Sequence, residues 1–240
     1  MRPTLVHIPH SPWSRRTRLA LRRMGVEVEE RPYTPTLSEP GLRWTLGRWR
    51  GSVSVPVLLR PGEPPLTDSF DIVCWASDRS DTPLAPPALR DALREWNART
   101  ESALSAGRQL TTLAVLDDPE ALRASLPPLV RRLGPVGMAI GRDAAWRLLR
   151  KYGDGRTEPA WEEDLHYYVA DLDRRLADHE HLLHRPSYAD LLAASGLAFV
   201  RPDPGSKVPE RARRCWTRRA LVDAYPRVFA WQERVLGDAP

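Results

Sequence analysis

All β-strand signals in this chain lie in its N-terminal part, and this division constrains the fold more than any other feature. Short apolar or alternating runs, which are typical of strands, occur at residues 4–8, 26–29, 55–59 and 66–67. From residue 88 onward the chain shows only helical periodicity. The sequence therefore predicts a small α/β domain followed by an all-helical domain.

The first two strand signals flank an amphipathic helix. Residues 11–14 (SPWS) are a helix start, Gly25 is a helix stop, and apolar residues recur between them at helical spacing. Five arginines, Arg16 among them, are expected on the exposed side of this helix. The two strands are predicted to pair in parallel, with the helix as the connection between them. A short further helix is expected within residues 42–49.

The next two strand signals lie on either side of a turn, and the first of them contains a proline. Pro56 lacks the N–H of a ladder donor, so we expect it at the entrance of the strand at 55–59 or in a special turn with a cis bond. The run at 66–67 is predicted to return antiparallel, and Asp68 and Ser69 are cap residues for a following helix. The first domain is thus predicted to have the order βαβ–ββα.

A proline-rich segment marks the predicted domain boundary. Residues 79–87 hold charged residues, turn formers and three prolines with little periodicity, so they are predicted to link a domain at 1–78 to a helical domain at 88–240. Helices are predicted at 88–112, 119–151, 158–183, 187–199, 208–222 and 225–236. Ser187 and Asp190 have capping-box spacing at the start of the fourth.

Two sets of apolar residues are expected in the core of the helical part. One face of the third helix is formed by Leu165, Tyr168, Val169, Leu172 and Leu176. Four tryptophans at helical positions are also predicted to be core residues, namely Trp96, Trp146, Trp161 and Trp231.

The charge of the chain does not favour a nucleic-acid-binding function. The formal net charge is +5 and the pI is about 9.6. Lys151 and Lys207 are the only lysines, and the many arginines are spread among acidic residues along the chain. This distribution is typical of solvated helix faces rather than of a phosphate-binding surface. We expect no nucleic-acid partner.

The chain also lacks the sequence features of membrane-spanning and exported proteins. It has no apolar run of about 18 residues, and Pro and Arg interrupt its N-terminal segment. The cysteines, Cys74 and Cys215, are far apart and fit a reducing compartment. His179, His181 and His184 are close in sequence but would face apart on a helix. We expect a cytoplasmic protein with no membrane partner, disulfide or metal.

Four segments of the chain carry a family resemblance. They are SPWSRRTRLAL at 11–21, VPVLLRPGEPPLTDSFDI at 55–72, PSYADLLAASGL at 186–197 and YPRVFAWQERVL at 225–236. In this order they resemble the glutathione transferase family, and the first resembles its serine-type members, which include the plant tau class and bacterial relatives. The resemblance implies a thioredoxin-like domain followed by an all-helical domain, and a two-fold homodimer.

The resemblance also implies a set of site residues. Ser11 matches the family's catalytic serine, with Trp13 and Ser14 supporting the helix N-terminus behind it. The residues implied to bind glutathione are Ser11, Ser54, Val55, Pro56, Asp68 and Ser69. Pro56 matches the family's cis-proline. Ser54 stands where many relatives have a basic residue and Asp68 where glutamate is common, which leaves either glutathione or a related thiol as the co-substrate.

These residue types suit thiol chemistry, although they also suit helix capping. A hydroxyl at a helix N-terminus can donate to a thiolate while the helix dipole adds positive potential, and only the thiolate is a good nucleophile. Ser11 is placed for that role. Ser11, Ser14, Asp68 and Ser69 are equally ordinary cap residues, so a structural role alone remains open.

The implied function is that of a glutathione S-transferase. Such an enzyme would add the thiol of glutathione to a small electrophilic or apolar substrate, as in detoxification. Two alternatives stay open. One is a non-catalytic protein of the same fold that binds apolar ligands or a protein partner, because fold does not fix function. The other is a glutathione-dependent isomerase.

Overall fold

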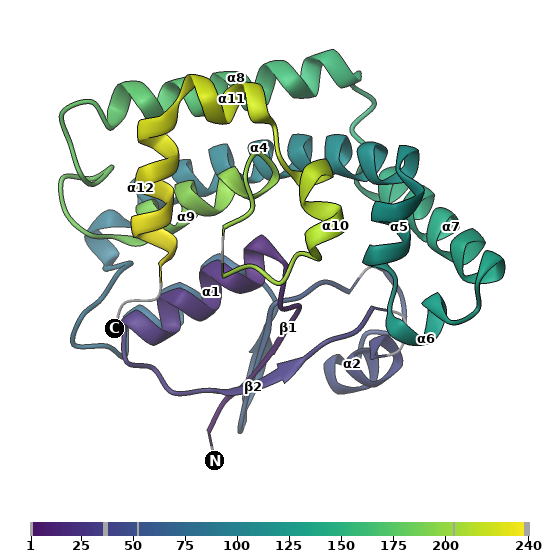
Figure 1. The fold of residues 1–240 in the computed structure, drawn as a ribbon. Helices are drawn as coiled ribbons and strands as arrows, with labels where there is room; N and C mark the ends of the chain where they lie inside the picture. The colour runs from purple at the N-terminus through teal and green to yellow at the C-terminus, as the bar shows by residue number, and fades with distance from the viewer. Residues whose placement is uncertain (1, 36–37, 52, 204, 238–240) are drawn as a thin grey trace. The chain divides into compact units, whose positions relative to one another are not determined.

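The computed structural model describes residues 2–35, 38–51, 53–203 and 205–237, and Figure 1 shows its helices and strands. The chain separates into two compact units. The first contains Met1–Asn97, His181–Ser195 and Leu236–Pro240, and the second contains Ala98–Glu180 and Gly196–Val235. The sequence predicts a boundary between two independently folding domains at 79–87. Independent folding is a different property from compactness, so this boundary stays a prediction.

The first unit is built on a four-stranded mixed sheet. Its strands are β1 (Thr4–His7), β2 (Glu29–Pro32), β3 (Val57–Arg60) and β4 (Glu63–Leu66). The strand order is β2-β1-β3-β4, with β1 parallel to β2 and antiparallel to β3, and with β4 antiparallel to β3. The helices between and after them are α1 (Pro12–Arg23), α2 (Glu39–Leu46) and α3 (Ser69–Ser77). The predicted thioredoxin-like order is confirmed.

The second strand begins later than the sequence predicts. The alternating run at 26–29 was expected to be the strand, but β2 starts at Glu29, and its residues are exposed. At the end of α1, Gly25 has a φ of +66° and the Val26 N–H donates to the Leu21 carbonyl at 2.9 Å. This return bond keeps residue 26 at the helix end. The chain therefore reaches the register with Thr4 only at Glu29.

The core of the first unit forms around the central strand. Leu5 and Val6 of β1 are buried, as are Val57 and Leu58 of β3. Val6 and Val57 belong to a cluster that also includes Leu42 of α2. Because apolar neighbours surround the central strand, the start of the turn that follows it, residues 8–11, is held in place.

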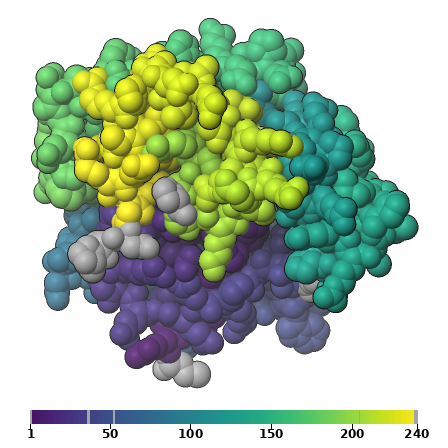
Figure 2. Space-filling view, viewed as in Figure 1, coloured from purple at the N-terminus to yellow at the C-terminus, as the bar shows by residue number. Residues whose placement is uncertain are grey.

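The remaining helices follow the sheet in the chain. They are α4 (Arg90–Asp117), α5 (Pro119–Ser125), α6 (Pro128–Arg131), α7 (Pro135–Tyr152), α8 (Glu158–Arg175), α9 (Tyr188–Gly196), α10 (Glu210–Arg213), α11 (Arg219–Ala224) and α12 (Pro226–Leu236). Short 3₁₀ helices occur at Pro87–Leu89, Leu197–Phe199 and Arg214–Trp216. Among the described residues no strand follows β4, as the sequence predicts. The helices α10 to α12, yellow-green to yellow in Figure 2, form part of the surface of the second unit.

Several predicted helices are shorter in the structure. The segment predicted as one helix at 119–151 consists of α5, α6 and α7. Pro128 and Pro135 each occupy the first turn of a new helix, and Gly134 before α7 has a φ of +56°. A proline cannot continue a helix because it lacks the N–H and clashes with the preceding turn. The helix predicted at 158–183 ends at Arg175, and the segment at 208–222 is divided among α10, a 3₁₀ turn and α11.

The expected core residues are buried with one exception. The predicted apolar face of α8 is buried along its length. Trp96, Trp161 and Trp231 are buried too, but Trp146 is 51% exposed, so its core prediction is wrong. The buried side of α7 consists of Gly137 and Gly141, where the helix approaches its neighbours closely. Trp146 lies away from that side.

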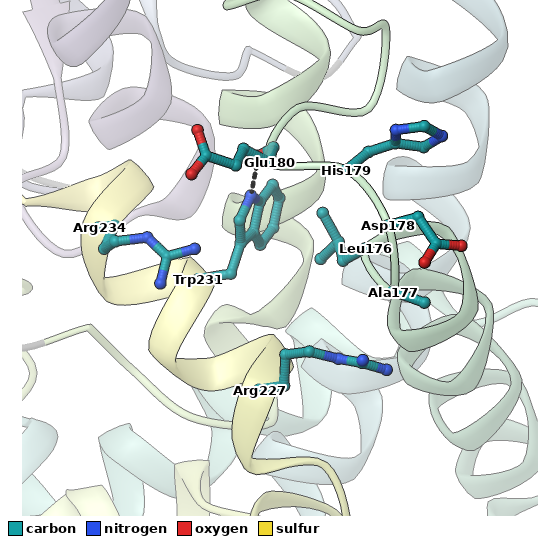
Figure 3. A pocket seen from close by; sticks show the side chains of 8 residues that line it. All are labelled: Leu176, Ala177, Asp178, His179, Glu180, Arg227, Trp231 and Arg234. Atoms are coloured by element: carbon teal, nitrogen blue, oxygen red, sulfur yellow. Dashed lines mark hydrogen bonds between the residues drawn. The ribbon is translucent and has the colours of Figure 1, made fainter.

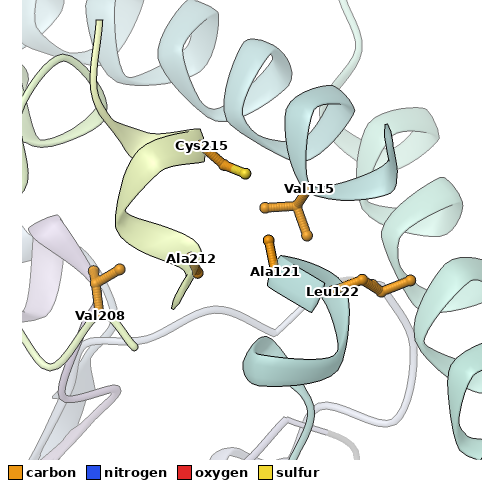
Figure 4. Close-up of a cluster of buried hydrophobic side chains, with 6 residues drawn as sticks. All are labelled: Val115, Ala121, Leu122, Val208, Ala212 and Cys215. Carbon is orange, nitrogen blue, oxygen red and sulfur yellow. The ribbon is translucent and has the colours of Figure 1, made fainter. Parts of the chain in front are cut away.

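A second-unit core cluster lies where α4, α5 and α10 meet, as Figure 4 shows. Its members are Val115, Ala121, Leu122, Val208, Ala212 and Cys215. Segments separated by about a hundred residues thus share one apolar cluster. None of the helices in the described part of the chain is both long and apolar enough to cross a bilayer.

Close packing predicts a destabilising substitution at Gly107 of α4. A Cβ atom there would lie 2.4 Å from the Cβ of Phe199, which cannot move without shifting backbone. We expect Gly107→Ala to lower the free energy of unfolding, because overpacking costs about 1–3 kcal/mol and exceeds the roughly 0.8–1 kcal/mol gained in helix propensity. Urea unfolding measures the difference.

The matched control is Gly41→Ala in α2, where an added Cβ meets no atom within 4 Å. This variant should be as stable as the parent or more stable by about 0.4–1 kcal/mol. Equal behaviour of the two variants would contradict the packing described for α4.

Candidate functional site

The first candidate residue, Ser11, is the N-cap of α1. Its φ and ψ of −73° and 127° are extended, and its carbonyl accepts from the Arg15 N–H at 2.9 Å. The Ser11 Oγ accepts a long hydrogen bond of 3.5 Å from the Ser14 N–H. Within the described part of the chain the Ser11 hydroxyl donates to no acceptor. A half-buried O–H at a helix N-terminus is therefore available as a donor.

Ser14 has a different role from Ser11. Its side chain is fully buried, and its Oγ accepts from the Ile8 N–H at 3.1 Å. The Ser11 N–H in turn donates to the Ile8 carbonyl at 3.1 Å. These two bonds hold the turn between β1 and α1. Trp13 is half-buried, and its carbonyl accepts from the Thr17 hydroxyl at 2.9 Å. The supporting role of Trp13 and Ser14 stays a prediction.

The second group of candidates lies just before β3. The Val55–Pro56 peptide bond is cis, which confirms the match of Pro56 to a cis-proline, and β3 starts at Val57 as expected for a proline at the strand entrance. Pro56 is buried, Val55 is half-buried and Ser54 is exposed. Among the described residues, neither the N–H nor the C=O of Val55 has a hydrogen-bond partner. Both groups can therefore pair with an extended peptide.

The third group of candidates lies at the N-terminus of α3. Asp68 is the exposed N-cap, and its Oδ1 accepts from the N–H groups of Phe70 at 2.8 Å and Asp71 at 3.2 Å. Ser69 follows as the first helical residue and is 4% exposed. Asp68 thus caps the helix, which is the purely structural role that the sequence left open for it. Its second carboxylate oxygen and the positive end of the helix leave the site suited to a charged amino-acid group.

Arg16 is a member of this site that the sequence interpretation missed. It was placed on the exposed side of α1, but it is 1% exposed. Its Nη2 donates to the Ser69 Oγ at 2.9 Å and to the Asn97 Oδ1 at 3.3 Å. Helical spacing offers the missed signal, because position 16 lies three residues after Trp13 and four before Ala20, on the apolar side.

The Arg16 contact changes what Ser69 can do. Because the guanidinium donates to the Ser69 oxygen, the hydroxyl proton of Ser69 is directed elsewhere. A buried cation behind the α3 N-terminus also adds to the positive potential of the helix end. Both effects favour an anionic group, such as a carboxylate, at this position.

The two cysteines of the chain are not activated thiols. Burial raises the pKa of the Cys74 thiol on α3 and of the Cys215 thiol in the second unit. The Cys215 Sγ donates weak hydrogen bonds to the Ala114 carbonyl at 3.5 Å and to Asp118 Oδ2 at 3.8 Å. Thiols with raised pKa values are poor nucleophiles near neutral pH. Neither cysteine is therefore our candidate for a nucleophile.

A cavity of about 250 Å³ in the second unit contains none of the predicted site residues. Figure 3 shows the end of α8 and the helix α12 on its two sides. The Trp231 indole N–H donates to the Glu180 carbonyl at 3.0 Å, and Arg227 forms an ion pair with Asp173 at 2.9 Å. Its lining residues are Leu176, Ala177, Asp178, His179, Glu180, Arg227, Trp231 and Arg234. The lining combines apolar, acidic and basic side chains, and Arg227 and Trp231 already have partners. It does not indicate a particular ligand or reaction.

Comparison with known families identifies the region that holds the candidates. Residues 10–79 match the family model described as the glutathione S-transferase N-terminal domain. Residues 10–79 are therefore similar to a glutathione S-transferase N-terminal domain. The matched residues include every predicted site residue from Ser11 to Ser69, and also Arg16. No curated protein matches the chain.

Solved structures similar to the whole chain support the same fold. A glutathione S-transferase from Methylobacterium radiotolerans in complex with glutathione sulfonate has a TM-score of 0.62 at 19% identity, covering 99% of this chain and 92% of that one. Rice GST1 in complex with glutathione has a TM-score of 0.53 at 20% identity, covering 99% and 87%. A β-etherase from Sphingobium sp. strain SYK-6 has a TM-score of 0.64 at 18% identity, covering 99% and 96%. The predicted resemblance to glutathione S-transferases is confirmed.

Arg16 is predicted to stabilise the first unit. Arg16→Met leaves the Ser69 hydroxyl and the Asn97 amide oxygen without their buried donor. An unsatisfied buried polar group costs about 1–3 kcal/mol, so we expect a loss of this size in the free energy of unfolding, measured with urea.

The control is Arg22→Met on the same helix, because the Arg22 side chain is 57% exposed and its ion pair with Glu30 is long, at 3.4 Å. An exposed pair of this kind contributes at most about 1 kcal/mol. If Arg16→Met were no more destabilising than Arg22→Met, the buried contact would not have the importance assigned to it.

Proposed function

We propose that this protein is a glutathione transferase-type enzyme in which Ser11 activates the thiol of glutathione, or of a related thiol, for attack on an electrophilic substrate. The observation that carries the proposal is the free donor of the Ser11 hydroxyl at the N-terminus of α1. The match of residues 10–79 to the glutathione S-transferase N-terminal domain supports it. A cytoplasmic homodimer that uses no metal and acts in detoxification is part of the same proposal.

The first step is stabilisation of the thiolate. A thiol with a pKa near 8.5 is mostly protonated at neutral pH, and only its conjugate base is a strong nucleophile. A hydrogen bond from the Ser11 O–H to the sulfur, with the positive end of α1, favours the anion. A stabilisation of about 1.4–3 kcal/mol lowers the thiol pKa by roughly one to two units. The proton leaves to solvent.

The other candidate residues hold the thiol peptide in place. The N–H and C=O of Val55, which have no partner among the described residues, are presented by cis-Pro56 and pair with the cysteinyl backbone of the peptide. Asp68 and Ser69 at the α3 N-terminus receive its amino-acid end, with the carboxylate near Ser69 and the ammonium near Asp68. Ser54 offers a neutral hydroxyl near the other end of the peptide.

The second step forms a carbon–sulfur bond. The thiolate donates an electron pair to an electrophilic carbon of the substrate, and either a leaving group departs with its bonding pair or an adjacent atom takes a proton from solvent. A small apolar electrophile is the proposed substrate. A β-etherase is among the similar structures, but at 18% identity it supports the fold alone.

The test is a pH titration of thiolate absorbance in the complex with glutathione, for the parent protein and for Ser11→Ala. We expect the pKa of the bound thiol to be roughly one to two units below that of free glutathione in the parent. In Ser11→Ala the shift should disappear, because the donor is gone.

Two further variants separate thiol activation from helix capping. Glycine is accepted at an N-cap with a loss of only a few tenths of a kcal/mol, so Ser11→Gly should fold normally yet lose the pKa shift. Ser11→Thr keeps a hydroxyl and should retain part of it. Binding of glutathione with an unshifted thiol pKa in the parent would favour the non-catalytic alternative, and no binding at all would refute the proposal.

A further inference from the structure

Two exposed tryptophans form an unusual surface feature on the first unit. Trp44 of α2 is 74% exposed, and Trp49 in the turn that follows is 65% exposed. Their ring centroids are 5.6 Å apart with an interplanar angle of 85°, so the two indoles touch edge to face. Together with Arg48 and Arg50 they form what we call the tryptophan–arginine patch. Residues of this segment lie at the surface in Figure 2.

Local folding explains why the indoles face outward. The inner side of α2 already packs on the sheet, because Leu42 is buried and Leu46 contacts the cluster that contains Val6 and Val57. Gly47 then ends the helix with a φ of +61°. The core is therefore complete without either tryptophan. Exposing two large aromatic side chains next to each other is unfavourable in water, and such patches mark interaction sites.

The patch carries net positive charge. From residue 40 to residue 62 the chain has four arginines and no acidic residue. Arg43 is paired with Glu39 at 2.7 Å, and Arg60 is paired with Glu63. Arg48 and Arg50 are exposed and have no ion pair among the described residues. The two charges beside the indoles are thus available to an anionic partner.

The segment is also held in a defined shape. The Arg43 guanidinium donates to the Arg48 carbonyl at 3.4 Å and to the Gly51 carbonyl at 2.9 Å. These bonds join α2 to the loop that carries Trp49 and the two exposed arginines. A preorganised surface loses less conformational entropy on binding than a flexible loop.

We propose that the tryptophan–arginine patch docks the protein reversibly on the surface of a membrane that contains anionic lipid. Indole rings favour the interface between headgroups and acyl chains, and arginines beside them are attracted to the negative surface potential. Neither requirement involves a spanning segment. This proposal departs from the sequence-based expectation of no membrane partner, which rested on the absence of such a segment.

The docking does not depend on the proposed enzyme activity, but the two would act together. The patch and Ser11 belong to the same compact unit. Docking would therefore bring the candidate site to a surface where apolar electrophiles accumulate. Weak binding through two aromatic and two cationic side chains suits reversible attachment.

The experiment is co-sedimentation of the full-length protein with phosphatidylcholine vesicles that either contain or lack phosphatidylglycerol, at low and high salt. We expect binding to the anionic vesicles at low salt and much weaker binding to the neutral ones. Trp44→Ala/Trp49→Ala should weaken the binding by about tenfold or more. Arg48→Gln/Arg50→Gln should weaken it by about fivefold for each arginine, and high salt should reduce that difference.

The matched control is Trp146→Ala on α7, which removes an indole that is 51% exposed and lies outside the patch. This variant should bind anionic vesicles like the parent, and circular dichroism should show that all variants are folded. Failure of the parent to bind anionic vesicles, or unchanged binding in the double tryptophan variant, would overturn the proposal. Tighter patch-dependent binding to a single-stranded oligonucleotide than to vesicles would overturn it as well, because the patch would then serve nucleic acid.

Discussion

A buried guanidinium connects the two helix N-termini on which the candidate site depends. Arg16, in the second turn of α1, donates to Ser69 at the start of α3 and to Asn97 of α4. Arginine is always charged and has five donors, so its burial is tolerated only where acceptors are held in place. The contact therefore requires α1 and α3 to keep one relative position. Ser11 and Asp68 cap those same two helices.

The central strand, β1, holds these elements in place. β1 pairs with β2 on one side and β3 on the other, and the turn after it is fixed by the bonds between Ile8, Ser11 and Ser14. The cis bond before Pro56 lies at the start of β3, the antiparallel neighbour of β1. The Ser11 hydroxyl, the Val55 peptide unit, which has no partner among the described residues, and the N-terminus of α3 thus lie next to strands of one sheet in the chain.

Much of this first unit follows from local sequence patterns. Gly25 ends α1, Pro56 precedes β3, and Asp68 caps α3, because each residue type has a strong backbone preference that holds in almost any surroundings. Family resemblance was needed to relate Ser11, Ser54 and Val55 to a thiol peptide. Their roles stay proposals, since capping alone also accounts for Ser11 and Asp68. Helix bounds were predicted least well where helix-breaking residues interrupt a helical pattern of apolar residues, as between α5 and α7.

The sequence by itself determined the order of strands and helices in the first unit, its cap residues and the proline that precedes β3, because these depend on backbone preferences within a few residues. Only the tertiary structure decided which side chains on a helix are buried. Arg16 and Trp146 were each assigned to the wrong side, because burial depends on which surfaces other segments cover rather than on the hydrophobicity of the residue. Trp44 and Trp49 are exposed for the same reason, because Leu42 occupies the space between α2 and the sheet.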